Sequence, residues 1–529
     1  MTKKDEIQLN RFNGDLMNKK KILVLIIFII IPMIISNIIF VFYSKFNSRE
    51  SRSNMSPLIS SKSWDPEAIP VCTQNGTQDS IKICSDGNGG AIIVWCDSRN
   101  DFGDIYAQLI NAQGICQWDA NGTAVCTAYG IQCSFDICSD GNGGVIIVWG
   151  HEYAYDIYAQ RIDATGNKLW DVNGVMIGDN DTYQFWPKIC SDGLAGAIIT
   201  WFEINVTSSV HAQRIDAFGS LLWTPGGVEI TATDNTNIID PQICTDGAGG
   251  AIIIWDDWRT TTSDIYAQHI NNNGIIQWTP NGKVICSAAG SQEFIKICSD
   301  PHPSGAAFLA WADWRDQING PDIYAQRIDT NGDVMWSPSN GVPVCTKNDW
   351  QTNIELCLDY QGGLIITWQD DREGGNEKRR IFAQRIAGGS PSWTQDGIRI
   401  CSANIKQLYQ KVCTNGSNGI FITWADYRER VYAQKLYTNG KIIGDSRGYL
   451  ICDSDYFQSG PDICPSNNGT VIIAWEDSRG PDRDLYAQRI NIEKYIPTLS
   501  PGISFGNYYI LILCVSLTLI IIVIKKELK

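Results

Sequence analysis

A tryptophan, an aspartate and an arginine recur along the chain with the spacing W-x-D-x-R, and an acid beside a base can form a catalytic or ligand-binding pair. The pattern is complete six times, with the pairs Asp97/Arg99, Asp257/Arg259, Asp313/Arg315, Asp370/Arg372, Asp426/Arg428 and Asp477/Arg479. A sialidase-type centre would need a few arginines converging on one ligand carboxylate. Six equivalent pairs do not converge in this way, so we predict repeated structural ion pairs.

The aspartates of the Ser-Asp-Gly turns are candidate calcium ligands, and Asp86, Asp140 and Asp192 are examples. Each has few acidic neighbours in sequence. We therefore favour an Asx-type turn, in which Asp caps its own backbone and Gly supplies a positive φ, and keep calcium as a minority hypothesis. The chain has no HExxH, nucleophile-elbow or P-loop motif, so we predict no other cofactor and nominate no catalytic residue.

Six pairs of cysteines are separated by twelve positions: Cys72/Cys84, Cys126/Cys138, Cys286/Cys298, Cys345/Cys357, Cys401/Cys413 and Cys452/Cys464. Outside a cell such pairs could form disulfides that join adjacent repeats. Cys190 and Cys244 occupy the second position without a partner. Their presence favours the alternative that all these cysteines are small buried residues that pack. Zinc is not predicted, because close C-x-x-C spacing is absent.

These residues belong to a repeat that governs the whole fold. Eight tryptophans follow an apolar run, at Trp95, Trp149, Trp201, Trp255, Trp311, Trp368, Trp424 and Trp475, with separations of 51 to 57 residues. Each copy contains four short strands rich in β-branched residues, with glycine-rich turns between them. A four-stranded unit of this length is typical of a propeller blade.

The ends of the repeat array predict a closed ring. The eighth copy stops after "DLYAQRI" at 484–490, without its final strand, and the missing piece, "WDPEAIPVC" at 64–72, precedes the first copy. The N-terminal segment can therefore complete the last blade and remove two open sheet edges. We predict an all-β, eight-bladed β-propeller with four-stranded blades over residues 64–490, closed by an N-terminal strand.

The repeat "SDGNGGAIIVW" with its following "DIYAQRI"-type strand resembles repeats of bacterial and archaeal surface proteins, and its S-D-G-x-G core is similar to the Asp-box of sialidase-type propellers. The resemblance implies a propeller, and such repeats serve many functions. The C-terminal segment "IPTLSPGISFGNYYILILCVSLTLIIIVIKKELK" resembles archaeal surface-sorting tails.

Two apolar runs predict membrane segments at the two ends. Residues 22–43 follow three lysines and read as a retained transmembrane signal-anchor, after a cytoplasmic tail at 1–21. Residues 508–524 form a C-terminal transmembrane helix or sorting tail, followed by a basic cytoplasmic tail at 525–529. Linkers at 44–63 and 491–507 flank the propeller. Both basic flanks are expected inside, so we predict a cell-membrane protein with its propeller outside the cell.

The charge of residues 64–490 restricts the possible partners. This segment holds 28 Lys and Arg against 51 Asp and Glu, a formal net charge of −23. Such a surface repels phosphate, so nucleic acid is not an expected partner. Sequons in this segment are possible glycosylation sites, at Asn75, Asn121, Asn180, Asn205, Asn415 and Asn468.

Function is expected where the repeat breaks, because loops on a rigid scaffold carry recognition. The irregular copies and the basic loop 373–380 provide the candidate ligand-binding residues His151, Glu152, Tyr153, Glu203, Arg379 and Arg380. We predict a binding, adhesion or cell-surface structural module for a glycan or protein. The alternative is a glycoside-processing hydrolase or lyase, which would need non-repeated carboxylates at the ring axis; Glu152 and Glu203 are its candidates.

Overall fold

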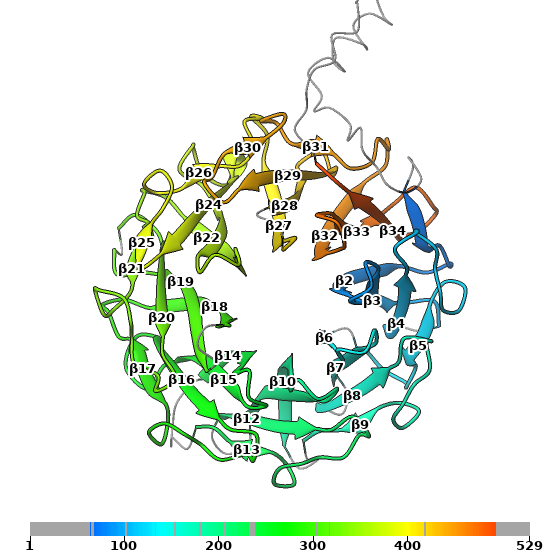
Figure 1. Cartoon of the computed structure of the whole chain (residues 1–529), viewed down its shortest axis with the longest axis horizontal. Coiled ribbons are helices and arrows are strands. Elements are labelled where there is room, and N and C mark those ends of the chain that lie inside the picture. Colours follow the sequence, from blue (N-terminus) through cyan, green and yellow to red (C-terminus); the bar gives the residue numbers. More distant parts are fainter. Residues whose placement is uncertain are drawn as a thin grey trace, which may run out of the picture.

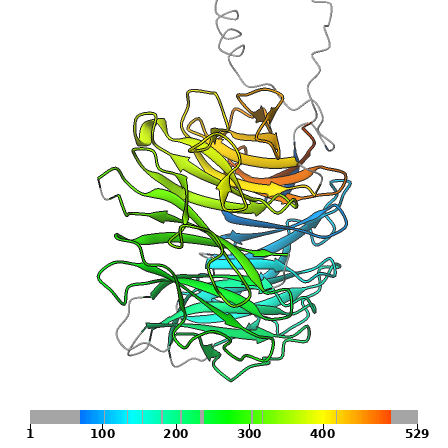
Figure 2. The same ribbon diagram turned by 60° about the vertical axis from the view of Figure 1, so that its left-hand side comes forward.

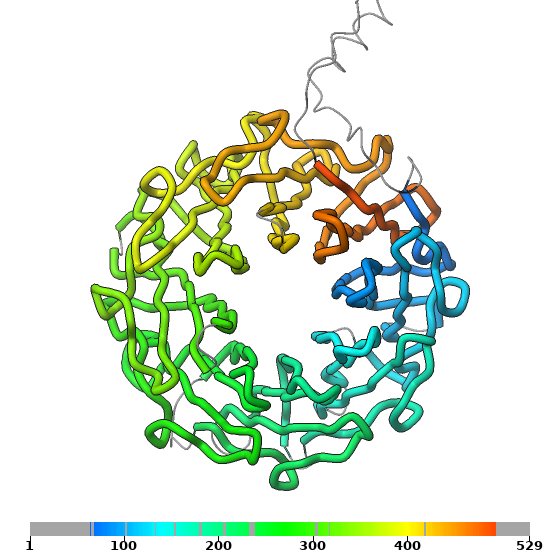
Figure 3. Tube along the Cα trace, in the orientation of Figure 1, coloured from blue at the N-terminus to red at the C-terminus, as the bar shows by residue number. Residues whose placement is uncertain are grey.

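The computed structural model describes residues 64, 68–100, 103–132, 134–152, 155–178, 182–204, 208–231, 238–301, 305–316, 318–416 and 419–492. Eight antiparallel sheets stand around a central opening (Figures 1 and 3). Among the described residues the one helical element is the short 3-10 helix η2 (Asn376–Lys378). The predicted eight-bladed, all-β propeller is therefore confirmed.

The first four blades follow the chain in order. Blade 1 comprises β2 (Gln78–Ser85), β3 (Ala91–Asp97), β4 (Asp104–Ile110) and β5 (Thr123–Cys126). Blade 2 comprises β6 (Ser134–Ser139), β7 (Val145–His151), β8 (Asp156–Ile162) and β9 (Val175–Met176). Blade 3 comprises β10 (Tyr183–Ser191), β11 (Ala197–Ile204), β12 (Ser208–Ile215) and β13 (Val228–Glu229). Blade 4 comprises β14 (Ile238–Thr245), β15 (Ala251–Asp257), β16 (Asp264–Ile270) and β17 (Lys283–Cys286).

The last four blades complete the ring. Blade 5 comprises β18 (Gln292–Asp300), β19 (Ala306–Asp313), β20 (Asp322–Ile328) and β21 (Val342–Cys345). Blade 6 comprises β22 (Gln351–Leu358), β23 (Leu364–Asp370), β24 (Arg380–Ala387) and the outer segments β25 (Ser390–Pro391) and β26 (Ile398–Arg399). Blade 7 comprises β27 (Gln407–Thr414), β28 (Gly419–Asp426), β29 (Val431–Tyr437), β30 (Ile442–Ile443) and β31 (Tyr449–Leu450). Blade 8 comprises β32 (Gln458–Pro465), β33 (Val471–Asp477), β34 (Asp484–Ile490) and β1 (Ile69–Cys72).

Each blade is an antiparallel meander whose first strand lies nearest the axis (Figure 1). In blade 8 the order is β1-β34-β33-β32, so the N-terminal strand supplies the outer strand of the last blade. Figure 2 shows the resulting stack of sheets from the side. The closure predicted from the two ends of the array is confirmed, and pairing of β1 with β34 covers edges that would otherwise be open.

The second strand of each blade is the centre of its core. All seven residues of β3 are buried, because both faces of the sheet pack against neighbouring blades. Trp95, two residues before the end of β3, is fully buried and stacks on Tyr106, with ring centroids 6.3 Å apart and ring planes at 23°. Glycine is required at position 122, where φ is 91° and a Cβ atom would overlap the Trp95 ring. The apolar run and the Asn-Gly turn thus form one packing unit.

A second tryptophan series packs seven of the eight blades against the next one, and blade 7 lacks this tryptophan. Trp118 Nε1 donates to the carbonyl of Ala164 in the following blade at 3.2 Å, and the indole packs against Gly166. Trp64 makes the same contact across the seam of the ring: its Nε1 donates to the Ala112 carbonyl at 3.1 Å and its ring packs against Gly114. The N-terminal segment therefore supplies both the missing strand and the missing tryptophan.

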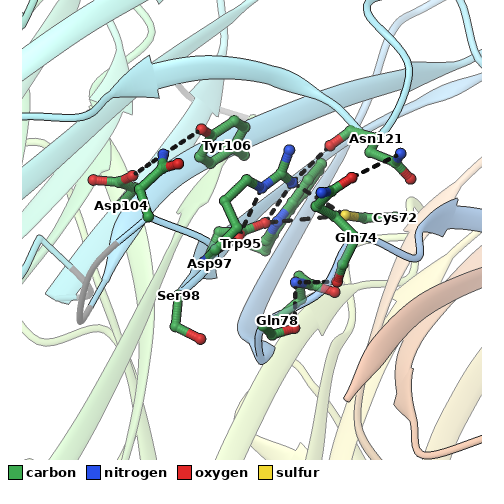
Figure 4. Close-up of polar contacts among 12 residues, drawn as sticks. Cys72, Gln74, Gln78, Trp95, Asp97, Ser98, Asp104, Tyr106 and Asn121 are labelled. Atoms are coloured by element: carbon green, nitrogen blue, oxygen red, sulfur yellow. Dashed lines mark hydrogen bonds and ion pairs between the residues drawn. The ribbon is translucent and has the colours of Figure 1, made fainter. Parts of the chain in front are cut away.

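The recurrent Asp and Arg form the predicted structural ion pairs. In blade 1, Asp97 accepts hydrogen bonds from Trp95 Nε1 at 2.7 Å and Arg99 Nε at 2.9 Å (Figure 4). The Arg99 guanidinium also lies 3.8 Å from the centroid of the Tyr106 ring. Equivalent ion pairs are present in blades 4 to 8. The prediction that these pairs belong to the scaffold is confirmed.

The Asp-Gly turns are Asx turns, as favoured from the sequence. Asp140 Oδ1 accepts from the backbone N–H of Asn142 at 2.8 Å and of Gly144 at 2.7 Å, while Oδ2 pairs with Arg161 at 2.8 Å. Within the described residues, no group of three or more His, Cys, Asp or Glu side chains is placed to hold a metal ion. Calcium binding at these turns is not tested by this arrangement and stays a prediction.

The six possible disulfides are not formed in this structure. All twelve cysteines, Cys72, Cys84, Cys126, Cys138, Cys286, Cys298, Cys345, Cys357, Cys401, Cys413, Cys452 and Cys464, are free thiols. In each pair the first cysteine lies at the end of the outer strand of one blade or just after it. The second lies on the axial strand of the next blade. The width of a sheet separates them, well beyond disulfide reach. Burial raises the pKa of Cys84 and of Cys298 to about 12, as expected of packing residues.

Predictions on the chain ends and sequons are only partly covered by the described residues. None of the helical structure in that part is long and apolar enough to cross a bilayer, and the predicted spans 22–43 and 508–524 lie outside it. Asn180 and Asn205 also lie outside it. Asn75 and Asn468 are exposed, whereas Asn121 and Asn415 are half-buried and accept backbone hydrogen bonds through Oδ1. The exposed pair are therefore the more accessible acceptors.

Candidate ligand-binding site

The first strands of all eight blades line two adjoining cavities at the ring axis, which we call the axial cleft. The larger cavity, of about 560 Å³, is lined by blades 1 and 4 to 8. The smaller, of about 430 Å³, is lined by blades 2 to 5. Asp240 and Phe294 line both cavities, so the two lie side by side. A concave site built from many blades of a rigid scaffold is suited to ligand binding.

A β-bulge in the axial strands aims side chains into the cleft. The register of seven of the eight axial strands shifts at the same place, and one residue there has a positive φ: Ser80, Trp186, Asp240, Phe294, Asn353, Tyr409 and Gly460. Three of these are aromatic, and Trp186, Phe294 and Tyr409 are 46%, 53% and 58% exposed. Positive φ is costly for such residues, by about 1–3 kcal/mol each, and bulges recur beside active sites.

A ring of charged residues lies two positions beyond the bulge, and its signs alternate around the axis. The equivalent residues are Lys82, Asp136, Lys188, Gln242, Lys296, Glu355, Lys411 and Asp462. Lys82 lies 2.9 Å from Asp136, and Lys411 lies 2.6 Å from Glu355. Burial acts to raise the pKa of Asp136, but the charges of Lys82 and Lys188 outweigh it and lower that pKa.

Gln242 breaks the alternation, and Asp240 compensates for it. Asp240 Oδ1 accepts a hydrogen bond from Gln242 Nε2 at 2.7 Å, which places a carboxylate beside the position where an acid would complete the ring. The pKa of Lys188 is lowered by burial, while the charges of Asp136 and Asp240 oppose this shift. With Asp240 counted, four lysines face four carboxylates. The cleft is therefore nearly neutral, on a propeller that is strongly acidic overall.

Two buried polar atoms on the wall of the smaller cavity have no hydrogen-bond partner, although the Asp256 carboxyl group also receives a backbone hydrogen bond from Phe294. Asp256 is 4% exposed and its Oδ1 atom makes no hydrogen bond; the indole N–H of Trp258 is likewise unpaired. Burial raises the pKa of Asp256 well above its usual range, and the charges of Asp240 and Glu293 add to this effect. Buried polar groups are nearly always hydrogen-bonded. An unpaired carboxyl oxygen and an unpaired N–H on one cavity wall thus suit a ligand hydroxyl, which both donates and accepts.

Replacement of Asp256 by Asn should remove a pH-dependent loss of stability. Since the folded pKa is raised, the folded protein binds the proton more tightly, and wild-type stability falls as pH rises above about 4, the unfolded value. Asp256→Asn should therefore become increasingly stable relative to wild type from pH 4 to pH 7. Urea titrations across this range measure the difference, with Asp171→Asn on an exposed turn as control. A difference independent of pH would contradict the assignment.

Three described residues predicted from irregular copies lie outside the cleft lining. His151 ends β7 with Nε2 3.0 Å from the Tyr129 carbonyl, and Glu152 is exposed in the following turn. Tyr153 lies outside the described residues. Glu203 is buried and accepts from Trp201 Nε1 at 3.0 Å, so it replaces the scaffold aspartate of blade 3. The prediction that Glu152 and Glu203 are the non-repeated axial carboxylates is wrong, because neither lines either cavity.

The two candidate arginines of loop 373–380 have different surroundings. Arg379 lines the larger cavity, where Nε and Nη2 each contact Asp371 at 2.8 Å and Nη1 lies 3.4 Å from Gln369 Oε1. Arg380 is the buried first residue of β24, and its Nε lies 3.5 Å from the Glu373 carboxylate. The structure thus brings Arg379 to the cleft and leaves Arg380 in the scaffold.

The cleft residues could have been found by comparing the repeats column by column. The residue between Trp and Asp is Cys96, Gly150, Phe202, Asp256, Ala312, Gln369, Ala425 or Glu476, so only blades 4 and 8 place an acid there. The alternating charges occupy one column, two residues before the axial cysteine. Both signals lie within the repeat. A search restricted to the loops where the motif breaks down therefore does not find these residues.

Comparisons with known proteins identify no family. No protein-family model matches the chain, and no curated protein matches it. Among solved structures, polysaccharide lyase Uly1 is similar at 11% identity, over 72% of this chain and 93% of that chain, with a TM-score of 0.45. Penicillium chrysogenum α-L-arabinanase complexed with arabinobiose is similar at 9% identity, over 68% of this chain and 92% of that chain, with a TM-score of 0.35. Prolyl oligopeptidase B from Galerina marginata is similar at 9% identity, over 76% of this chain and 56% of that chain, with a TM-score of 0.40.

These likenesses are too distant to indicate a function, whereas the cleft has features that do. The predicted resemblance to bacterial and archaeal surface proteins stays a prediction.

Proposed function

We propose that the propeller binds a glycan in the axial cleft. Exposed aromatic rings beside unpaired donors and acceptors carry this proposal. A sugar ring presents an apolar C–H face, which stacks on an aromatic side chain, and an edge of hydroxyl groups that need hydrogen-bond partners. Trp186 and Phe294 supply rings, and Asp256 and Trp258 supply partners, within the same cavity. The balanced charge ring favours a ligand without strong net charge.

The proposal includes a setting outside the cell, with residues 22–43 and 508–524 as membrane tethers and nucleic acid excluded as a partner by charge. Glycan binding at a surface suits adhesion or capture of extracellular polysaccharide. Protease treatment of intact cells, followed by detection of the released propeller, tests this setting: loss of the propeller from the cell surface is expected, and full protection would contradict it.

Trp186→Ala should weaken glycan binding about 30-fold, as for a central aromatic contact worth about 2 kcal/mol. Ligands are first found on an array of purified glycans, and their affinities are then measured by calorimetry. Phe218→Ala is the matched control, since that ring is 87% exposed on an outer turn away from the cleft lining. Equal effects of the two variants, or no glycan bound by wild type, would overturn the proposal.

Glycoside hydrolysis is the second candidate function, favoured by one observation. Burial raises the pKa of Asp256 well above its usual range, and the side chain shares its cavity with Asp240 and Glu293. A glycosidase needs such an acid to protonate the leaving oxygen and a carboxylate to activate water or attack the sugar. Asp256→Asn should then keep binding and lose turnover, measured as new reducing ends. If the wild type binds a glycan without turnover, hydrolysis is ruled out and glycan binding remains as the function.

A further inference from the structure

Blade 3 carries a continuous run of aromatic rings that ends in the axial cleft, and we call it the aromatic strip. Its members are Tyr155, Tyr183, Phe185, Trp186 and Phe202. Ring centroids are 5.1 Å apart for Tyr183 and Tyr155, 5.5 Å for Tyr155 and Phe185, and 6.3 Å for Phe185 and Trp186. Phe202 is buried below the strip and lies parallel to Trp186, at 5.5 Å and 19°.

The repeat makes this concentration of rings unusual. Blade 3 has an aromatic residue in four columns, at Tyr183, Phe185, Trp186 and Phe202. In the same four columns no other blade has more than one. Seven blades therefore build the same core without these rings. Packing of the scaffold does not account for them, because the scaffold contacts are repeated in every blade.

The strip is open to solvent and is held in place by strained backbone. Tyr183, Tyr155 and Trp186 are 56%, 40% and 46% exposed. Tyr155 and Trp186 have φ values of 57° and 51°, which are costly for aromatic residues and persist where surroundings impose them. A backbone hydrogen bond of 2.7 Å from Gln184 N to the Tyr155 carbonyl fixes the loop of blade 2 against β10. The rings thus form a preorganised, exposed surface.

The inner end of the aromatic strip indicates what kind of ligand would cover the rings. Trp186 also lines the smaller cavity, next to Asp256 and Trp258 with their unpaired polar atoms. A ligand that fills this cavity and continues past Trp186 meets Phe185, Tyr155 and Tyr183 in turn. Successive units of a chain, each with an apolar face, match successive rings. A single sugar or a disaccharide would leave the outer rings uncovered.

From these contacts we infer that the aromatic strip is an extended subsite for a linear oligosaccharide chain, one end of which occupies the smaller cavity of the axial cleft. This inference rests on the proposed glycan binding and narrows its ligand to the class of unbranched polysaccharides. The strip makes most of its contacts with units outside the cavity. Chain length should therefore control affinity through Tyr183 and Tyr155, independently of Trp186.

The test uses purified ladders of cello-, xylo-, manno- and chito-oligosaccharides, from disaccharide to hexasaccharide, with affinities measured by calorimetry on the full propeller. For the ladder that binds, wild-type affinity should rise with length. Tyr183→Ala should weaken hexasaccharide binding about 10-fold and leave the disaccharide unchanged, whereas Trp186→Ala should weaken both. Tyr183→Phe keeps the ring and should retain hexasaccharide affinity.

Phe457→Ala is the matched control, since it removes an aromatic ring, 65% exposed, from the column of Tyr183 in blade 8. Thermal melts verify that each variant is folded. Affinity that does not depend on length, or equal losses for Tyr183→Ala and Phe457→Ala, would overturn the chain subsite and leave glycan binding in place. No binding of any ladder by wild type would overturn the chain subsite for these polysaccharides, and no binding on the whole glycan array would overturn both proposals.

Discussion

Asp97→Ala should lower the free energy of unfolding by about 3–5 kcal/mol, the range for breaking a buried ion pair from one side. Asp97 is fully buried and accepts hydrogen bonds from Trp95 Nε1 at 2.7 Å and from Arg99 Nε at 2.9 Å. The Arg99 guanidinium also donates to the Asn121 carbonyl at 2.8 Å. Without the carboxylate, an indole N–H and a guanidinium charge remain inside the blade with too few acceptors.

Urea unfolding followed by tryptophan fluorescence measures this loss. Asp445→Ala is the matched control, since Asp445 pairs with Arg447 at the same sequence spacing and at 2.9 Å, but both side chains are partly exposed. That variant should lose less than about 1 kcal/mol. The double variant Asp97→Ala/Arg99→Met removes the stranded charge and should recover part of the loss. Similar losses for Asp97→Ala and Asp445→Ala would show that the buried clamp contributes no more than a surface pair.

Trp64→Ala should destabilise the ring at its seam by about 3–5 kcal/mol, the usual cost of deleting a buried tryptophan side chain. Trp64 is 9% exposed and packs in one core cluster with Val71 of β1, Tyr106 of blade 1 and Cys464 of blade 8. Its Nε1 donates to Ala112 across the junction. Strands β32 to β34 of blade 8 have no direct covalent link to blade 1, so the pairing of β1 with β34 and the packing of Trp64 against blade 1 hold the closure.

Hydrogen exchange should show the location of this effect as well as its size. In Trp64→Ala, amides of β1 and β34 should exchange faster before those of blades 3 to 6 do. Trp350→Ala is the control, since that ring is 50% exposed and its removal should cost less than about 1 kcal/mol. Uniform acceleration around the ring in Trp64→Ala would contradict a local role at the seam.

Asp97→Ala and Trp64→Ala both test how the blades are held together, and ligand binding depends on this arrangement. Every blade contributes at least one residue to the axial cleft, so the shape of the cleft follows from how the blades are held together. Repeated contacts fix the blades, and the residues that vary within the repeat face the axis. Opening the seam should therefore weaken glycan binding even though Trp64 does not line the cleft.

The sequence alone was enough to establish the architecture, because the period of the tryptophans, the turn glycines and the divided last blade are local or additive signals. It also identified the Asp–Arg pairs as scaffold, since six equivalent copies have one structural explanation. The choice between disulfides and packing thiols stayed open in the sequence, because spacing along the chain does not reveal radial position: Cys72 and Cys84 lie twelve residues apart but at opposite edges of neighbouring sheets.

Only the tertiary structure decided which variable residues meet. His151 and Glu203 depart from the repeat most visibly, yet they face the scaffold or the rim. Asp240, Asp256 and Glu293 come from two blades and three strands, and the closure of the ring brings them to one cavity. The aromatic strip likewise joins a loop of blade 2 to β10 and β11 of blade 3. A repeat sequence specifies each blade through local packing, whereas the axial site depends on how eight blades close around a common axis.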